Sequence, residues 1–318
     1  MVIEHAGQRI VRKPWGNTDL RPWSEHRADG GVGEIWFERS DRQAPDSALL
    51  LKLLFTNEPL SIQVHPSDAF AHSIGLANGK SEAWYILSAT PDARVAVGLK
   101  RQLAPAQLRA AIENGSIAEL VAWCEVAKGD VISVPAGTIH AIGAGLVIAE
   151  IQQRSEATFR LFDHGREREL HVDHGVAAAR AGPADRQAVR QRLTDARTLL
   201  IASPHFVLER IELSPASHWE LRAEQETWLL VVEGEARIGQ MNATIGEAFY
   251  VEADRADIEV GASGLKGLLA YIGPDANSSL LRRLDQPEAK PALRRVSSPP
   301  LHHRAIGRAP FSTREARQ

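Results

Sequence analysis

Cysteine, long apolar runs and an excess of charge of one sign are all scarce in this sequence. Cys124 is the single cysteine in 318 residues, which excludes an intramolecular disulfide and a zinc site built from cysteines. The 37 Lys and Arg residues nearly balance the 40 Asp and Glu residues, so charge gives no reason to expect nucleic acid or a membrane as partner. No apolar run approaches the roughly 18 residues that span a bilayer, and the first residues contain no apolar signal segment. We therefore expect a soluble, cytoplasmic protein, and the sequence carries no signal of its oligomeric state.

Short apolar runs separated by Gly, Pro or polar residues fill the first half of the chain and predict β-strands. These runs cover residues 48–55, 60–65, 83–87, 94–97, 130–134 and 146–152. Residues 104–123 differ, because their apolar residues recur at helical spacing, with Pro105 near the start and Asn114-Gly115 in the middle. We predict two short helices for this insert.

The second half repeats the strand pattern after a change of composition. The chain is rich in Ala and Arg over 172–201, and we predict a helical linker over 181–204. Strands are expected at 206–213, 228–233, 235–238, 248–251 and 267–272. The fold class is therefore mainly β, with two β-barrel domains at 1–180 and 205–280 and a basic, proline-rich extension over 281–318. We expect the extension to be solvated and assign it no function.

One predicted strand carries polar side chains on a single face. In the segment LSIQVHP, strand alternation places Ser61, Gln63 and His65 on one side, and Leu60, Ile62 and Val64 on the other. Three polar groups facing a dry core would be costly. The pattern therefore favours a cavity that holds a metal ion or a polar ligand.

Two further segments bring ligand-type residues to strand ends. Glu82 enters the strand at 83–87, with Lys80 two residues before it. The segment GDVISVPAGTIH fits G-x5-P-x-G-x2-H, in which a tight turn at Pro135 and Gly137 delivers His140 into a barrel.

Gln63, His65, Glu82 and His140 together form a set of nitrogen and oxygen ligands from three strands. Each residue alone has an ordinary explanation as a hydrogen-bonded or solvated group. Their joint occurrence, in this order, favours a metal site. The set suits catalytic zinc, and Mn²⁺, Fe²⁺, Co²⁺ or Ni²⁺ would also fit it.

The residues quoted so far resemble the cupin superfamily, and more narrowly the short bacterial form of the type I phosphomannose isomerases. The matching segments are KPWG at 13–16, GEIW at 33–36, LLLKLL, EPLSIQVHPSD, GKSEAWYIL, VPAGTIHAI and AEIQQRSEATFRLFD. They span roughly residues 13–165, about half of the chain.

The resemblance implies isomerisation between mannose 6-phosphate and fructose 6-phosphate through an enediol, with a sugar phosphate as the small-molecule partner. It implies one zinc ion on Gln63, His65, Glu82 and His140, the four positions that the strand pattern had brought together. Three implied catalytic residues are Arg160, Glu150 as candidate base, and Lys80. Two implied substrate-binding residues are Lys52 and Ser61. Lys52 is notable by itself, because a lysine inside the apolar run at 48–55 needs a phosphate or carboxylate partner.

The second β-region reads as a cupin that has lost its metal. Glu252, Asp254 and Asp257 stand roughly where the cupin pattern would have Pro, Gly and His, and His218 has no ligand partners at the right spacing. We expect this region to be structural. Two alternatives remain open for the whole chain: an isomerase of another aldose, with or without a phosphate group, and a non-catalytic sugar-binding cupin.

Overall fold

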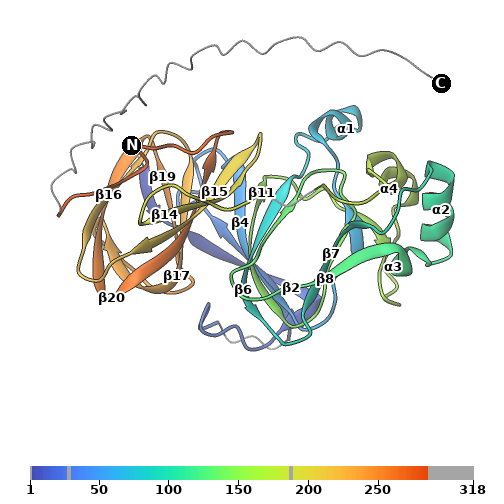
Figure 1. The fold of residues 1–318 in the computed structure, drawn as a ribbon, viewed down its shortest axis with the longest axis horizontal. Coiled ribbons are helices and arrows are strands. Elements are labelled where there is room, and N and C mark those ends of the chain that lie inside the picture. Colours follow the sequence, from blue (N-terminus) through green and yellow to red (C-terminus); the bar gives the residue numbers. More distant parts are fainter. Residues whose placement is uncertain (1, 27–29, 186–188, 286–318) are drawn as a thin grey trace, which may run out of the picture. The chain divides into compact units, whose positions relative to one another are not determined.

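Antiparallel β-sheets form most of the structure, a computed structural model that describes residues 2–26, 30–185 and 189–285 (Figure 1). A six-stranded sheet has the order β2 (Gly7–Asn17), β3 (Val32–Glu38), β4 (Leu49–Thr56), β11 (Leu146–Gln153), β6 (Glu82–Ala89) and β9 (Val131–Val134). A five-stranded sheet has the order β12 (Phe159–Phe162), β5 (Ile62–Val64), β10 (His140–Ile142), β7 (Arg94–Leu99) and β8 (Val121–Glu125). The mainly β fold class is confirmed.

The third sheet has ten strands and comes mostly from the second half of the chain. Its main path runs β1 (Val2–His5), β19 (Ala248–Glu252), β17 (Thr227–Ile238), β20 (Asp254–Ile272), β15 (Phe206–Leu213), β14 (Arg197–Ala202) and β13 (Gln191–Arg192). Off this path, β16 (His218–Ala223) pairs with β20 and β21 (Leu281–Arg283), and β18 (Met241–Ala243) pairs with β17. The N-terminal strand β1 thus joins a sheet whose other strands lie beyond residue 190.

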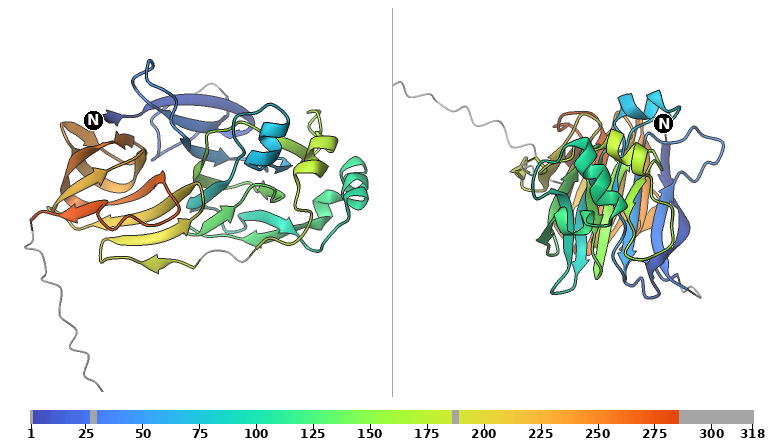
Figure 2. Two further views of the ribbon diagram at one scale, coloured as in Figure 1. Left: turned by 90° about the horizontal axis from the view of Figure 1, so that it is seen from above. Right: turned by 90° about the vertical axis from the view of Figure 1, so that its right-hand side faces the viewer.

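Helices are few in the described residues: α1 (Asp68–Ser73), α2 (Pro105–Glu113), α3 (Ile117–Leu120) and α4 (Val172–Ala178). They gather on the side of the smaller sheets that is remote from the ten-stranded sheet (Figure 2). We call the six- and five-stranded sheets with these helices the first β-region, and the ten-stranded sheet the second β-region.

Strand β4 of the six-stranded sheet is buried on both faces, which explains the apolar run at 48–55. On one face, Leu51 and Leu53 join a core that also contains Trp228 of the second β-region. On the other face, Lys52 points into the space between the two sheets of the first β-region, which pack on each other through a separate apolar cluster. A strand with both faces covered needs a nearly continuous apolar run, and Lys52 interrupts it at the site.

The five-stranded sheet separates an apolar cover from the same interior. Ile62 and Val64 of β5 pack with Ile112 of α2 in a core beneath the helices. Gln63 lies between them in sequence and lines the interior cavity instead. The predicted alternation is therefore confirmed for residues 61–64. It is wrong for Leu60, which lines the cavity beside Ser61, because Leu60 precedes the strand, which begins at Ile62.

The helical insert is confirmed as α2 and α3, separated at Gly115, whose φ of +78° favours glycine. The chain is already extended again from Val121, where β8 begins. The helical prediction for the linker 181–204 is wrong: its described residues contain β13 and β14, and the nearest helix, α4, ends earlier. An Ala- and Arg-rich composition indicated a helix, whereas pairing with β15 and burial of Leu200 fix a strand.

The predicted extension at 281–318 begins with a strand of the fold. Leu281 pairs with Leu221 of β16, and Leu280 and Leu281 belong to the core of the second β-region. The rest of the extension, 286–318, lies outside the described residues, and the described part of the chain forms one compact unit, Met1–Asp285. The division into domains at 180 and 205 stays a prediction. Among the described residues no helix is long and apolar enough to cross a membrane.

Candidate metal centre and active site

Three strand ends bring the ligand-type residues of the first β-region together. His65 follows β5, Glu82 opens β6 and His140 opens β10, and all three are buried. Glu82 lies between the two imidazoles, with Oε2 3.3 Å from His65 Nε2 and Oε1 3.4 Å from His140 Nε2. Their ligand atoms all lie within 4.8 Å of one another. Among residues 2–26, 30–185 and 189–285, His65, Glu82 and His140 therefore form a group of three side chains that could hold one metal ion.

Backbone carbonyl groups orient both histidines. His65 Nδ1 donates to Ala157 O at 2.8 Å, and His140 Nδ1 donates to Thr138 O at 2.9 Å. The proton on Nδ1 leaves the lone pair of each Nε2 directed at Glu82, which is the tautomer that a metal ligand needs. The turn that carries Thr138 has Gly137 at a φ of +84°, as the tight-turn prediction requires.

Gln63 completes the group from the neighbouring strand. It stands opposite His140 in the pairing of β10 with β5, and its Nε2 lies 3.2 Å from His140 Nε2. Ser61 donates a hydrogen bond to Gln63 Oε1 at 3.1 Å. The four predicted ligands are thus adjacent in the structure.

The donor set fits a divalent transition-metal ion. Glu82 Oε2 is buried and no hydrogen bond with good geometry reaches it from the described residues, although Lys80 Nζ lies 3.0 Å away. Two imidazoles, one carboxylate and an amide are ligands typical of such an ion. The ammonium of Lys80 offsets part of the cost of burying this oxygen, and a cation held here would satisfy it further.

Burial and charge keep these groups in the protonation states that bind metal. Burial lowers the pKa of His65 to about 3, with Lys80 lowering it further, and burial also lowers the pKa of His140. Burial would raise the pKa of Glu82, but Lys80 and the histidines hold it well below its usual value. Neutral imidazoles and an ionised carboxylate are therefore favoured around neutral pH.

A cavity of about 290 Å³ opens above the metal group. Gln63 and Lys80 belong to its wall, and Lys80 Nζ also lies 3.1 Å from His65 Nε2, so these two residues connect the cavity with the ligands. The other lining residues are Lys13, Trp15, Glu34, Trp36, Lys52, Leu54, Leu60, Ser61, Ile142, Glu150, Glu156, Thr158, Arg160 and Arg168. All five residues with implied catalytic or substrate-binding roles therefore line one cavity.

Lys52 and Glu150 form the centre of a charged row along the six-stranded sheet. They are paired across β4 and β11, with Lys52 Nζ 3.3 Å from Glu150 Oε1, 3.8 Å from Glu34 Oε2 and 2.7 Å from the Gln152 oxygen that accepts its hydrogen bond. Burial lowers the pKa of Lys52, and burial with the nearby Glu82 raises the pKa of Glu150. The partners that the sequence required for a buried lysine are these carboxylates.

Arg160 approaches the cavity from the five-stranded sheet. It is opposite Gln63 in the pairing of β12 with β5. Its NH1 donates to Glu169 O at 2.6 Å, while its Nε is buried with no hydrogen-bond partner among the described residues. Burial and the nearby Arg168 lower the pKa of Arg160, so an anion at this place would meet a poorly neutralised cation.

Sequence reasoning missed several residues of the cavity, including Lys13, Glu34, Trp36 and Arg168. Glu34 accepts a hydrogen bond from Trp36 Nε1 at 2.5 Å and lies 3.3 Å from Lys13 Nζ. Lys13 belongs to the KPWG segment, and Glu34 and Trp36 belong to the GEIW segment. The sequence therefore showed both motifs but gave no indication that their side chains contact each other. The alternation of Glu34 and Trp36 along a strand was the available signal.

The fold and the site define a cupin-like β-protein with a buried His/Glu metal group at the base of a charged cavity. No family model matches the chain. It is 34% identical to the mannose-6-phosphate isomerase ManA of Bacillus subtilis over 247 residues, 73% of this chain and 74% of that protein. It is also 34% identical to the mannose-6-phosphate isomerase of Streptococcus mutans over 210 residues, 64% of each protein.

The chain belongs to the mannose-6-phosphate isomerase family. Its fold is similar to the crystal structure of the mannose 6-phosphate isomerase from Bacillus subtilis, with a TM-score of 0.75 and 23% identity, covering 86% of this chain and 100% of that one. The family suggested by the sequence motifs is thereby confirmed.

Proposed function

We propose that this protein interconverts D-mannose 6-phosphate and D-fructose 6-phosphate, with one zinc ion held by Gln63, His65, Glu82 and His140. The observation that carries the proposal is that one cavity connects the metal group with a carboxylate. Gln63 and Lys80 line this cavity and contact the metal group, and Glu150 lines it as well. A sugar seated there would meet a Lewis acid and a carboxylate base at once. Membership of the family supports the same reaction.

The charge of the cavity supports a phosphorylated substrate. Five cationic side chains and three carboxylates line it, namely Lys13, Lys52, Lys80, Arg160 and Arg168 against Glu34, Glu150 and Glu156. A cationic surplus in a partly enclosed site attracts an anion. An unphosphorylated aldose would leave this surplus unused.

Isomerisation moves one proton between C2 and C1 of the open-chain sugar. Glu150 would remove the proton from C2 of mannose 6-phosphate and return it to C1, while the O2 proton is lost and O1 gains one, so that the aldehyde becomes a ketone. Burial raises the pKa of Glu150, which makes its carboxylate a stronger base than an exposed glutamate. The pairing with Lys52 would hold it in place.

Cations around the substrate would stabilise the negative charge that develops on the enediolate oxygens. Zinc, when bound, supplies electrophilic polarisation of the sugar carbonyl. Arg160, whose Nε has no hydrogen-bond partner in the described part of the chain, would offer donors to the sugar oxygens or to the phosphate. Lys80, whose Nζ lies close to Glu82 and which lines the cavity, would do the same. Ser61 and Lys52 would bind substrate from the cavity wall.

The deciding experiment is turnover of mannose 6-phosphate by the purified protein before chelation, after chelation and after zinc is added back. We expect activity to disappear with the metal and to return with zinc. Metal-replete protein that isomerises unphosphorylated mannose but not mannose 6-phosphate would overturn the substrate. Metal-replete protein inactive on both sugars would favour a non-catalytic sugar-binding protein.

A further inference from the structure

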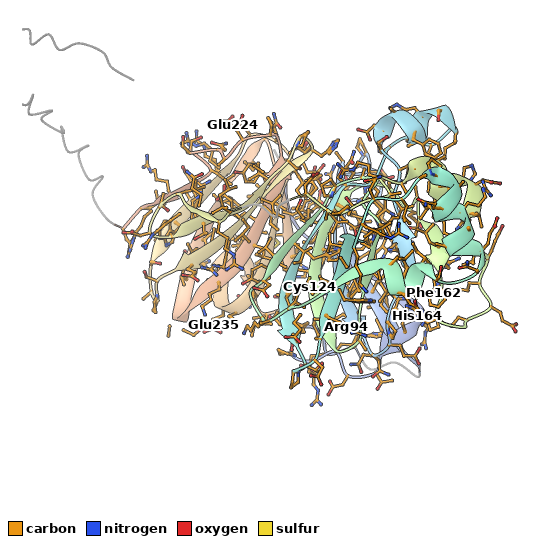
Figure 3. The ribbon with its side chains drawn as sticks, turned by 45° about the vertical axis from the view of Figure 1, so that its right-hand side comes forward. Arg94, Cys124, Phe162, His164, Glu224 and Glu235 are labelled. Atoms are coloured by element: carbon orange, nitrogen blue, oxygen red, sulfur yellow. The ribbon has the colours of Figure 1, made fainter. Side chains whose placement is uncertain are left out.

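Arg160 lies on an edge strand, and the chain returns to cover that edge. β12 is the first strand of the five-stranded sheet, with β5 on one side only. The chain leaves β12 at Phe162, passes His164 (both labelled in Figure 3) and comes back at Glu169–His171 before α4. The free edge of β12 is therefore occupied by a loop segment.

His171 takes the place of a neighbouring strand at Arg160. Its backbone N–H donates to Arg160 O at 2.8 Å. The complementary bond comes from its ring, because Arg160 N–H donates to His171 Nδ1 at 3.0 Å. One histidine thus satisfies both backbone groups of Arg160, and its ring must keep Nδ1 unprotonated to do so.

The same segment holds the guanidinium group. Arg160 NH1 donates to Glu169 O, which fixes one end of the group, while Nε has no hydrogen-bond partner within the described residues. The loop itself is closed by Asp163, whose side chain accepts hydrogen bonds from Arg168 Nε and NH2, both at 2.6 Å, and from Arg166. One loop therefore fixes both the backbone and the side chain of Arg160, and ion pairs of Asp163 with Arg166 and Arg168 stabilise that loop.

We propose that His171 is a positioning residue for Arg160: through its Nδ1 it fixes the backbone from which the guanidinium reaches the cavity. The proposal rests on the proposed function, since it assigns His171 a share in the same reaction. A displacement of an active-site group by about 1 Å can cost roughly 100-fold in rate. His171 is neither a lining residue of the cavity nor a member of the metal group, so its effect would pass through Arg160.

The test compares three variants of the full chain loaded with zinc. His171→Ala removes the ring acceptor. His171→Asn keeps an acceptor, because the side-chain Oδ1 of Asn occupies about the position of the imidazole Nδ1. His174→Ala is the matched control, since His174 is an imidazole of the adjoining α4 that stacks on Phe159, with ring centroids 5.2 Å apart.

We expect His171→Ala to lower kcat for mannose 6-phosphate by about 10-fold to 100-fold, with a smaller change in KM and normal zinc content. His171→Asn should recover kcat to within about threefold of the wild type, and His174→Ala should stay within about twofold. Equal losses in the Ala and Asn variants, or no loss in either, would overturn the proposal.

Hydrogen exchange of the Arg160 amide separates this proposal from the proposed function. We expect protection in the wild type and in His171→Asn, and clearly faster exchange in His171→Ala. If the wild type did not isomerise mannose 6-phosphate, the reaction would be wrong while the exchange pattern still reported the contact. Unchanged exchange in His171→Ala would refute the positioning contact itself.

Discussion

The two β-regions bury very different interiors. The first holds Lys52, Lys80, Glu82, His140 and Glu150 between its sheets. The second buries mainly aliphatic and aromatic side chains, and its buried charged groups include Arg197 and Glu209. Buried charges cost free energy unless they are paired, so an interior of the first kind needs stability from elsewhere. The shared core behind the six-stranded sheet, where Trp228 packs with Leu51 and Leu53, is where the second β-region supplies it.

Burial of charge alone does not distinguish the regions. In the second, Arg197 donates two hydrogen bonds to Glu209, at 2.8 and 2.7 Å, and Tyr271 adds a third to the same carboxylate. That network is closed. In the first, Glu82 Oε2 and Arg160 Nε are buried with no hydrogen-bond partner among the described residues. The same holds for Arg210 Nε, His218 Nε2 and Arg222 Nε of the second β-region, so a buried polar atom that lacks such a partner does not by itself mark a site. Glu82 and Arg160 differ because they belong to the metal group and to the cavity wall, where a metal ion and a substrate would bind.

Neutralising one buried glutamate in each region is the strongest test of this difference between the two regions. Glu82→Gln should abolish zinc binding and lower turnover by about 1,000-fold or more, because it removes the charged ligand and the Lewis acid with it. Glu209→Gln should leave kcat per folded molecule unchanged and lower the unfolding free energy by about 3 kcal/mol, because Arg197 loses its counter-charge. Metal analysis, steady-state kinetics and denaturant unfolding check both.

A Glu82→Gln protein that kept full zinc content would show that the ligand set is wrong. A Glu209→Gln protein that lost turnover while remaining folded would show that the second β-region takes part in the chemistry.

A smaller effect is expected from Glu150→Gln, which keeps the metal group and removes the base. Turnover should fall by about 100-fold to 10,000-fold, with substrate binding largely retained. Burial raises the pKa of Glu150, and a base must be unprotonated to act. In the wild type, kcat should therefore fall as pH drops through a value above that of an ordinary glutamate, and this limb should be absent in the variant.

Exchange of the substrate C2 proton with solvent gives the second readout for Glu150→Gln. The exchange should slow together with kcat. Unchanged exchange in the variant would assign the base to another residue.

The strand with the proposed metal ligands Gln63 and His65 was predictable because its evidence is local. Alternation with a period of two places Gln63 and His65 on the face opposite Ile62, and the structure agrees. Lys52 was also informative alone, since a charge inside an apolar strand requires a partner. Its partners, Glu34 and Glu150, are respectively 18 and 98 residues away in sequence, so their contacts come only from strand pairing.

Other features had no local signal. The hydrogen bond between the Arg160 amide and His171 Nδ1 depends on the conformation of a loop, and the hydropathy pattern does not indicate that conformation. Strand β14 lies in an Ala- and Arg-rich segment, where composition favoured a helix and tertiary pairing prevailed. Strand β21 is three residues long and opens a basic, proline-rich segment, so neither length nor composition separated it from the extension.

The smallest effects are expected from shortening the chain, and they test whether the second β-region only supports the first. A chain ending at Asp285 should keep the kcat and thermal midpoint of the full chain, because every side chain assigned to the site lies before that point.

A chain ending at Asn277 should lose β21 and the burial of Leu280 and Leu281, which lowers the unfolding free energy by about 3 kcal/mol or the Tm by roughly 5 °C. Its kcat at a temperature where it is folded should still match the full chain, since β21 borders β16 on the second β-region and not the cavity. A loss of turnover without a fall in Tm would mean that the second β-region shapes the active site and does more than support the first.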